Sequence, residues 1–199
     1  REDAEGEAKI TASVLAGETL YSYDAEGYFY TVDTETFQRT KLGDGIHGLT
    51  ESLAAQDKLG AGLTYYVDVP YSVVDMTYDP DTGKLYATME AYHISPILDS
   101  FQALIAEVDP ATGEIKEQIL KDPEIRPSNL LFRDGKLYFV DGFTVGMLTS
   151  IDLTGNRSPV QQAIFAKYWG DFVGGRSFVE DRLTGTVYAI RDLRTEYYD

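Results

Sequence analysis

The feature that most constrains the fold of this chain is a short sequence pattern that occurs four times along its length. A turn, then Lys or Thr, then Leu or Val, then Tyr begins the segments that carry Tyr21, Tyr86, Tyr138 and Tyr188. These tyrosines recur at intervals of about fifty to sixty-five residues, which is the period of a repeated supersecondary unit. We therefore expect one small architecture repeated along the chain.

A second pattern lies between the copies of the first. Apolar and polar residues alternate and then end at an Asp followed by a turn, as in Asp109-Pro110-Ala111-Thr112-Gly113. Pro110 presets φ for the turn, the Asp109 carboxylate can accept bonds from the N–H groups of the turn, and Gly113 tolerates a positive φ. The same reasoning applies to residues 79–83 and 152–155. Alternating strands joined by such turns predict antiparallel sheets.

The two patterns together divide the chain into units of four short strands. The predicted strands are residues 9–16, 19–25, 28–34 and 37–43; 72–79, 84–91, 103–109 and 114–120; 127–134, 136–142, 147–153 and 160–166; and 176–182 and 186–192. Four short strands in a unit of about fifty residues are typical of a β-propeller blade. The sequence therefore predicts an all-β fold of about three and a half to four four-stranded antiparallel blades.

On the Asp-Pro-x-Thr-Gly turn and the Gly-Lys-Leu-Tyr strand start, residues 9–195 resemble β-propeller repeat proteins of the quinoprotein-like, NHL-like and surface-layer kinds. The resemblance implies the architecture and no single family. The Trp-Asp signature of WD40 blades is absent, and so is the tryptophan of quinoprotein blades, because the only Trp, Trp169, is predicted to lie in a loop.

A propeller has to close, because an open sheet edge invites aggregation. Three ways of closing stay open at this point. The chain is part of a longer propeller of about six to eight blades, or its last blade is completed by its N-terminal residues or by residues 193–199, or two chains share one ring. Residues 1–8 are polar and charged and are predicted to be an acidic tail or linker, so the propeller domain spans residues 9–199.

The composition excludes several classes of function. Seventeen Lys and Arg against 33 Asp and Glu give a net charge of −16, which repels phosphate backbones and anionic lipid and argues against nucleic-acid binding. The absence of cysteine excludes disulfides, thiolate metal sites and cysteine nucleophiles. No apolar run is long enough to span a membrane. An acidic, tyrosine-rich chain without cysteine fits a secreted or cell-surface bacterial protein, and the start at Arg1 indicates a removed targeting peptide or a longer parent chain.

The segment Gly43-Asp44-Gly45-Ile46-His47-Gly48 matches the G-x-G-x-x-G pattern of dinucleotide-binding turns. Such a turn follows a buried parallel strand, whereas the preceding residues 37–42 are mostly polar. Asp44 would also repel a pyrophosphate. We therefore interpret the segment as the start of a long connection, residues 43–71, between two blades.

Other chemical signals are weak. His47 and His93 are the only histidines and lie in the two longest loops, where both are expected to be solvated. Residues 79–90 begin like a calcium loop, but their glycine is one position early and a strand follows, so a simple turn is favoured. No cofactor is required, and a calcium ion held by carboxylates and carbonyls of the acidic loops stays an open alternative. Helical spacing at residues 94, 98, 101 and 105 predicts a short helical insertion before a strand at Ala103.

Ligands of propellers usually meet the long loops at one face, here residues 43–72, 90–102, 121–128, 141–146 and 167–176. The candidate ligand-binding residues in them are His93, Tyr168, Trp169, Phe172 and Arg176, because an aromatic platform beside an Arg suits sugar or peptide recognition. The alternative for Trp169 is a plug between blades. The sequence thus favours a non-catalytic module that binds protein, peptide or glycan. A propeller-type lyase or hydrolase with a channel carboxylate or His and a divalent ion is the alternative.

Overall fold

A computed structural model describes residues 9–46, 72–93, 100–122, 127–141, 147–161, 177–181 and 184–190. Within these ranges all regular structure is β and there is no helix. The strands are β1 (Ile10–Ala16), β2 (Thr19–Asp24), β3 (Phe29–Val32), β4 (Arg39–Gly43), β5 (Ser72–Asp79), β6 (Lys84–His93), β7 (Ser100–Val108), β8 (Ile115–Asp122), β9 (Pro127–Arg133), β10 (Lys136–Asp141), β11 (Met147–Asp152), β12 (Arg157–Gln161), β13 (Ser177–Asp181) and β14 (Thr186–Ile190).

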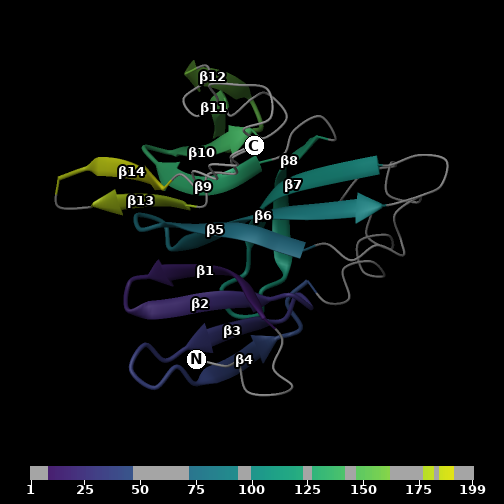
Figure 1. Ribbon diagram of the computed structural model, residues 1–199, viewed down its shortest axis with the longest axis vertical. Coiled ribbons are helices and arrows are strands. Elements are labelled where there is room, and N and C mark those ends of the chain that lie inside the picture. The colour runs from purple at the N-terminus through teal and green to yellow at the C-terminus, as the bar shows by residue number, and fades with distance from the viewer. Residues whose placement is uncertain are drawn as a thin grey trace, which may run out of the picture. The chain divides into compact units, whose positions relative to one another are not determined.

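The strands form sheets in strict chain order (Figure 1). Sheets β1–β4, β5–β8 and β9–β12 have four strands each, and β13 and β14 form a two-stranded sheet. Every pair of neighbours within a sheet is antiparallel. This is the arrangement of consecutive blades, so the predicted β-propeller fold is confirmed, with three full blades and one half blade in the described part of the chain.

Two boundary predictions are wrong. The helical insertion was predicted to precede a strand at Ala103, but β7 already begins at Ser100, and Phe101 pairs with Tyr92 of β6. The long β6–β7 hairpin supplies a backbone partner for each of these residues, and this ladder overrides the helical spacing. Residues 94–99 lie outside the described part. The strand predicted at residues 160–166 instead begins at Arg157, because the tight turn at Asp152 returns the chain to the sheet earlier.

Five of the tight turns have one local cause, an Asp at the end of a strand. The carboxylate of Asp33 accepts bonds from the N–H groups of Glu35 and Thr36 and from the Thr36 hydroxyl. Asp79, Asp109, Asp152 and Asp181 begin equivalent turns with their own set of side-chain and backbone bonds. The fifth residue of four of these turns has a positive φ, and it is glycine in three and Phe37 in the fourth. The predicted role of the Asp and Gly positions is confirmed.

The chain divides into two compact units, residues 1–123 and 124–199. In the first unit, β1 contacts β5, and the facing sides of the two sheets enclose an apolar core. Its fully buried large members are Val73, Leu85, Met89, Leu104, Tyr23 and Phe29. In the second unit, β9 contacts β13. Contact between the first strands of consecutive sheets is what blades of a propeller make around their axis.

Candidate functional site

The two longest connections between described strands are residues 44–71 and 162–176, and each joins the last strand of one sheet to the first strand of the next. Since antiparallel strands alternate in direction, the turns after the first and third strands share one end, and the other connections share the opposite end. Within each full blade this second end also carries the connection after the second strand, which is four to six residues long, at residues 25–28, 94–99 and 142–146. His47 belongs to the first of the two longest connections, the candidate residues Tyr168, Trp169, Phe172 and Arg176 belong to the second, and all five lie outside the described residues.

His93 is the only candidate residue within the described part. It is the last residue of β6, and its backbone pairs with Ser100 at the start of β7. With ten residues, β6 is longer than β2 and β10, which have six each. A contact of His93 with a carboxylate, which the enzymatic alternative requires, stays a prediction.

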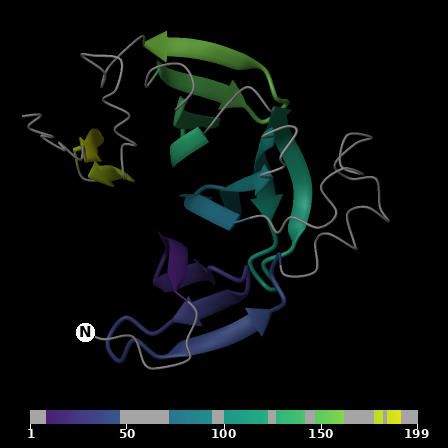
Figure 2. The ribbon, with the colours of Figure 1, turned by 45° about the vertical axis from the view of Figure 1, so that its right-hand side comes forward.

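The Gly43–Gly48 segment is explained by contact between the two blades of the first unit. The turn from β7 to β8 reaches the end of β4 (Figure 2), where Gly45 N–H donates to the Thr112 carbonyl at 3.1 Å. A Cβ on Gly43 would lie 2.6 Å from that carbonyl oxygen. Ile46 N–H donates to the Gly27 carbonyl at 2.9 Å. The N–H groups of Gly45 and Ile46 are therefore occupied, so this half of the motif serves blade packing and offers no phosphate cradle.

The same docking buries polar groups that the sequence pattern did not single out. Tyr23 donates its hydroxyl to the Gly113 carbonyl, and burial, followed by the charge of Asp109, raises the pKa of Tyr23 above its ordinary value. Phe29 lies between the ring of Tyr23, at 4.7 Å between centroids, and Gly113. Tyr23 and Gly113 are 90 residues apart in sequence, and no local signal connects them.

The start of the longest connection is therefore a fixed stem. Ile46 is buried, whereas the side chain of Asp44 is 82% exposed and pairs with Lys41 at 3.0 Å. The Lys41 ammonium lies 3.7 Å from the centroid of the Tyr28 ring, a cation–π contact. The stem thus presents a carboxylate, an ammonium and an aromatic ring at the end of the blade where the long connections leave.

A buried carboxylate organises the neighbouring β2–β3 connection. Asp24 is 2% exposed and accepts bonds from the N–H groups of Glu26 and Tyr28 and from the Tyr30 hydroxyl. Burial, followed by the bond to Asp24, raises the pKa of Tyr30 to about 12. With three donors on its oxygens, Asp24 acts as a cap of this connection. The signal in the sequence was the Asp-Ala-Glu-Gly run, which resembles the other Asp turns.

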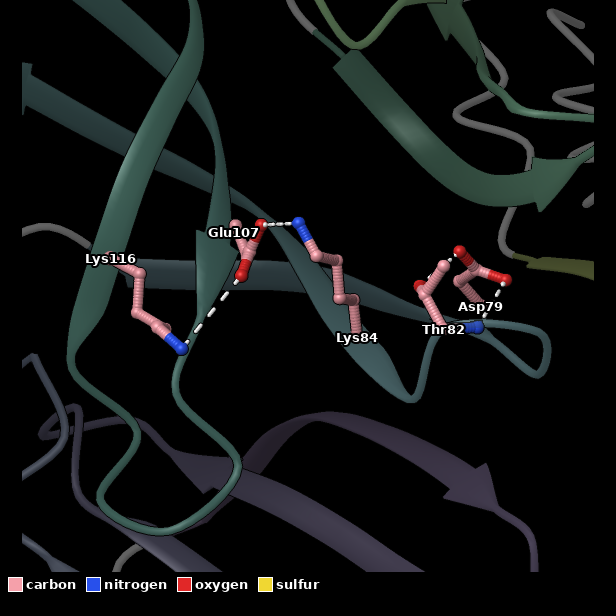
Figure 3. A network of polar contacts seen from close by, with 5 residues as sticks. All are labelled: Asp79, Thr82, Lys84, Glu107 and Lys116. Carbon is pink, nitrogen blue, oxygen red and sulfur yellow. Dashed lines mark hydrogen bonds and ion pairs between the residues drawn. The ribbon is translucent and has the colours of Figure 1, made fainter.

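A polar network crosses the second blade near its short turns (Figure 3). The Glu107 carboxylate lies between Lys84, at 2.6 Å, and Lys116, at 4.0 Å. The bond to Glu107 raises the pKa of Lys84, so that ammonium keeps its proton. Tyr86 stands opposite Glu107 on β6 and is buried, and burial followed by the Glu107 charge raises its pKa to about 12.

These shifts decide what the described groups can do chemically. Tyr23, Tyr30, Tyr86 and Lys84 are held in their protonated forms at neutral pH. Hydrogen bonds within the turns lower the pKa of Asp33 and Asp152, which stay ionised. A general acid or base works best with a pKa near the working pH. None of these six groups has a pKa that is shifted toward neutral pH.

The remaining predicted chemistry concerns metals and membranes. In the described ranges no three His, Asp or Glu side chains gather into a metal-binding group. The Asp79 carboxylate accepts bonds from the Asp81 N–H and the Thr82 hydroxyl, so residues 79–83 form the predicted turn. Calcium bound by the long connections stays a prediction. Among the residues that the structure describes, no helix is long and apolar enough to cross a bilayer.

Comparison with known proteins supports the fold. No protein-family model and no curated protein matches the chain. It is similar to a structural genomics protein of unknown function from Bacteroides thetaiotaomicron, with a TM-score of 0.55 and 11% identity over 94% of this chain and 40% of that chain. It is also similar to an exo-β-1,3-galactanase from Phanerochaete chrysosporium, with a TM-score of 0.52 and 13% identity over 94% of this chain and 44% of that chain.

The WD40 β-propeller domain of Doa1 is a third similar structure, with a TM-score of 0.44 and 11% identity over 82% of this chain and 44% of that chain. This chain therefore spans less than half of the length of each of the three proteins. At these identities the likenesses concern the fold alone. The class is a β-propeller, built of consecutive four-stranded antiparallel blades.

Proposed function

We propose that the chain is a non-catalytic binding or scaffold module that recognises a protein, peptide or glycan through its long connections. The observation that carries the proposal is the length of the two connections 44–71 and 162–176 compared with the turns that join strands within the blades. At one end, the strands are joined by turns whose polar groups bond to one another. At the other end, connections as long as residues 44–71 and 162–176 leave from fixed strands. Long loops on a rigid scaffold are where binding residues concentrate.

The stem of the longest connection supports this proposal. Lys41, Tyr28 and Asp44 form an ammonium–aromatic–carboxylate group at its start. Aromatic rings stack on sugars and apolar side chains, and the two charged groups bond to hydroxyl, amide or ionised groups of a ligand. The proposed aromatic cluster of Tyr168, Trp169, Phe172 and Arg176 would add a second such surface from another connection.

The test is a screen of the purified chain on a glycan array and a peptide library, followed by calorimetric titration of the hits. We expect a hit to be lost when residues 48–70 are replaced by a Gly/Ser linker of about ten residues, or when Trp169→Ala is introduced. The matched control is Asp81→Asn, an exposed position in a short turn, which should leave binding unchanged. Binding that survives both changes, or that is lost with Asp81→Asn, would refute the proposal.

The alternative function, a propeller-type lyase or hydrolase, is tested in the same screen by following product formation from bound glycans with and without added calcium. In that case product forms and His93→Ala abolishes turnover, whereas under our proposal the chain binds its ligand and no product forms. We also propose a secreted or cell-surface location, because the acidic composition without cysteine fits it. Cell fractionation and surface labelling of the native protein would test it.

A further inference from the structure

The fifth residue of the β3–β4 turn is an exposed Phe at a position that the second blade gives to glycine. In the first blade, the Phe37 N–H donates to the Asp33 carbonyl at 2.8 Å. In the second blade, the Gly113 N–H donates to the Asp109 carbonyl at 2.7 Å. Both fifth residues have a positive φ, +60° for Phe37 and +77° for Gly113. The two turns therefore have the same backbone, and the Phe37 Cβ points in the direction that a Cβ on Gly113 would take.

That direction leads to the face of the sheet that is turned away from the following blade. A Cβ on Gly113 would lie 2.4 Å from the Phe29 Cβ of the first blade, so the fifth residue of this turn faces the preceding blade. In the first sheet, the corresponding face is the one turned away from β5, and there Phe37 is 64% exposed. A further blade cannot dock on this face as the first blade docks on the second, because its counterpart of Phe29 would meet the Phe37 ring. The face therefore needs an occupant of another kind.

A row of aliphatic side chains lies on the same face, directly beside the turn. Leu15 pairs with Leu20, and Leu20 pairs with Val32, so the three side chains share one side of the sheet. Val14 and Tyr21, which alternate with them, pack against the core between the first two sheets. The row therefore lies on the side away from β5, where Leu15 is 54% exposed and Leu20 and Val32 are half-buried.

The second blade shows what such a row does when another sheet covers it. The corresponding row contains Leu85 and Val108, which pair with each other and are 0% and 1% exposed in the core that the two sheets enclose. With Phe37, the row of the first blade has the composition of a packed sheet face. Leu15 and Phe37 are nevertheless more than half exposed in the described part of the chain.

We propose that this face packs against the same face of a second copy of the chain, about a two-fold axis parallel to the strands. Such an axis keeps the short turns of both copies at the same end and places β1 of one copy opposite β4 of the other. Phe37, beside β4, then packs against the partner's Leu15. Leu20 and Val32, in the middle of the sheet, pack against each other across the axis, since two sheet faces pack about 10 Å apart. The inference does not depend on the proposed binding function.

The charges of the face favour this arrangement. The polar positions of the two rows nearest the short turns include no carboxylate and are Ser13, Ser22, Tyr30, Arg39 and Lys41. The contact thus avoids the net charge of −16 that would otherwise keep two copies apart. Arg39 lies at the β4 edge of the aliphatic row, and Glu18 lies in the turn at its β1 side. The two-fold axis brings Glu18 to the partner's Arg39, so opposite charges meet twice.

Sedimentation velocity over a wide range of concentrations tests the proposal. We expect the 22.2 kDa chain to be a monomer when dilute and a dimer when concentrated. Phe37→Gly should raise the dissociation constant at least about tenfold, because it removes the aromatic anchor. This variant relieves a strained φ and keeps the fold, which circular dichroism at monomeric concentrations checks. The matched control is Leu153→Ala, which truncates an apolar residue that is 38% exposed in a turn of the third blade and should leave the constant unchanged.

A charge exchange tests the direction of the axis. Glu18→Arg and Arg39→Glu should each weaken the dimer by up to about fivefold, because each leaves like charges opposite one another. The double variant exchanges the charges in both contacts and should recover most of the loss. The proposal is overturned by a wild-type chain that stays monomeric at every concentration, by an assembly larger than a dimer, or by a dimer that Phe37→Gly weakens no more than Leu153→Ala does. A double variant that binds no tighter than the single variants overturns it as well.

Discussion

The packing of the β7–β8 turn against the first blade leads to a prediction about Gly113. Its φ is +77°, and a Cβ at this position would lie 2.5 Å from the Cγ of the buried Phe29. Gly113→Ala therefore adds two costs, a left-handed backbone and a clash with a core ring. The left-handed conformation costs an L-residue about 1–2 kcal/mol, and overpacking of a core costs about 1–3 kcal/mol. We expect a total loss of about 2–5 kcal/mol.

Two further glycines separate these costs. Gly83 occupies the same turn position with a φ of +74° and has nothing within 4 Å of a built Cβ. Gly83→Ala should therefore lose only the backbone cost, about 1–2 kcal/mol. Gly43 has an ordinary φ but approaches the Thr112 carbonyl at 2.6 Å, so Gly43→Ala should lose only the packing cost, about 1–3 kcal/mol.

Equilibrium urea unfolding followed by far-ultraviolet circular dichroism measures all three losses by linear extrapolation. The reasoning requires the loss for Gly113→Ala to exceed the loss for Gly83→Ala by at least about 1 kcal/mol. Equal losses for Gly113→Ala and Gly83→Ala would refute the docking of this turn on Phe29.

Three other predictions follow from the turns and from the polar network. Phe37 has a φ of +60° where equivalent turns have glycine, so Phe37→Gly should stabilise the chain by about 0.5–1 kcal/mol in urea unfolding, and a loss would contradict the turn geometry. The pKa of Asp152 is lowered on folding, so its stabilisation is present above about pH 4 and disappears as pH falls through the folded pKa. The difference in melting temperature between wild type and Asp152→Asn should therefore begin to shrink as the pH falls below about 4 and keep shrinking toward the lowered pKa of the folded state, and a constant difference would exclude the charge as the cause. A double-mutant cycle of Lys84→Met and Glu107→Gln should give a coupling of about 0.2–1 kcal/mol that decreases in high salt, because Lys84 is 42% exposed, and a coupling insensitive to salt would argue against an ion pair.

The sequence predicted the local structure well because each strand and turn has a local cause. Strand β5 begins and ends at the predicted residues, and the Asp79 turn forms as its Asp, Thr and Gly require. The start of β12 was wrong by three residues, because the segment contains Pro159, which is rare within strands. An outermost strand accepts a proline, since one side of it needs no N–H.

The contacts between blades could not be predicted in the same way. Gly43 and Gly113 belong to different sheets, and their need for a missing Cβ arises only when those sheets stack. The candidate binding residues share this limit. Tyr168 and Trp169 are single positions in a long connection, and no periodic pattern relates them to His93 in another connection. Local alternation predicts strands, whereas a binding site depends on which loops the stacking brings together.

The anchored residues Gly45 and Ile46 have a practical consequence for engineering. Their backbone bonds to Thr112 and Gly27 fix the point where the chain leaves one sheet, and Ser72 marks where it joins the next. A foreign peptide inserted between Ile46 and Ser72 would have both ends held at fixed positions, while the contacts between the blades stay as they are. This part of the chain thus suits peptide display, with the blades as a rigid support for inserts that can be exchanged.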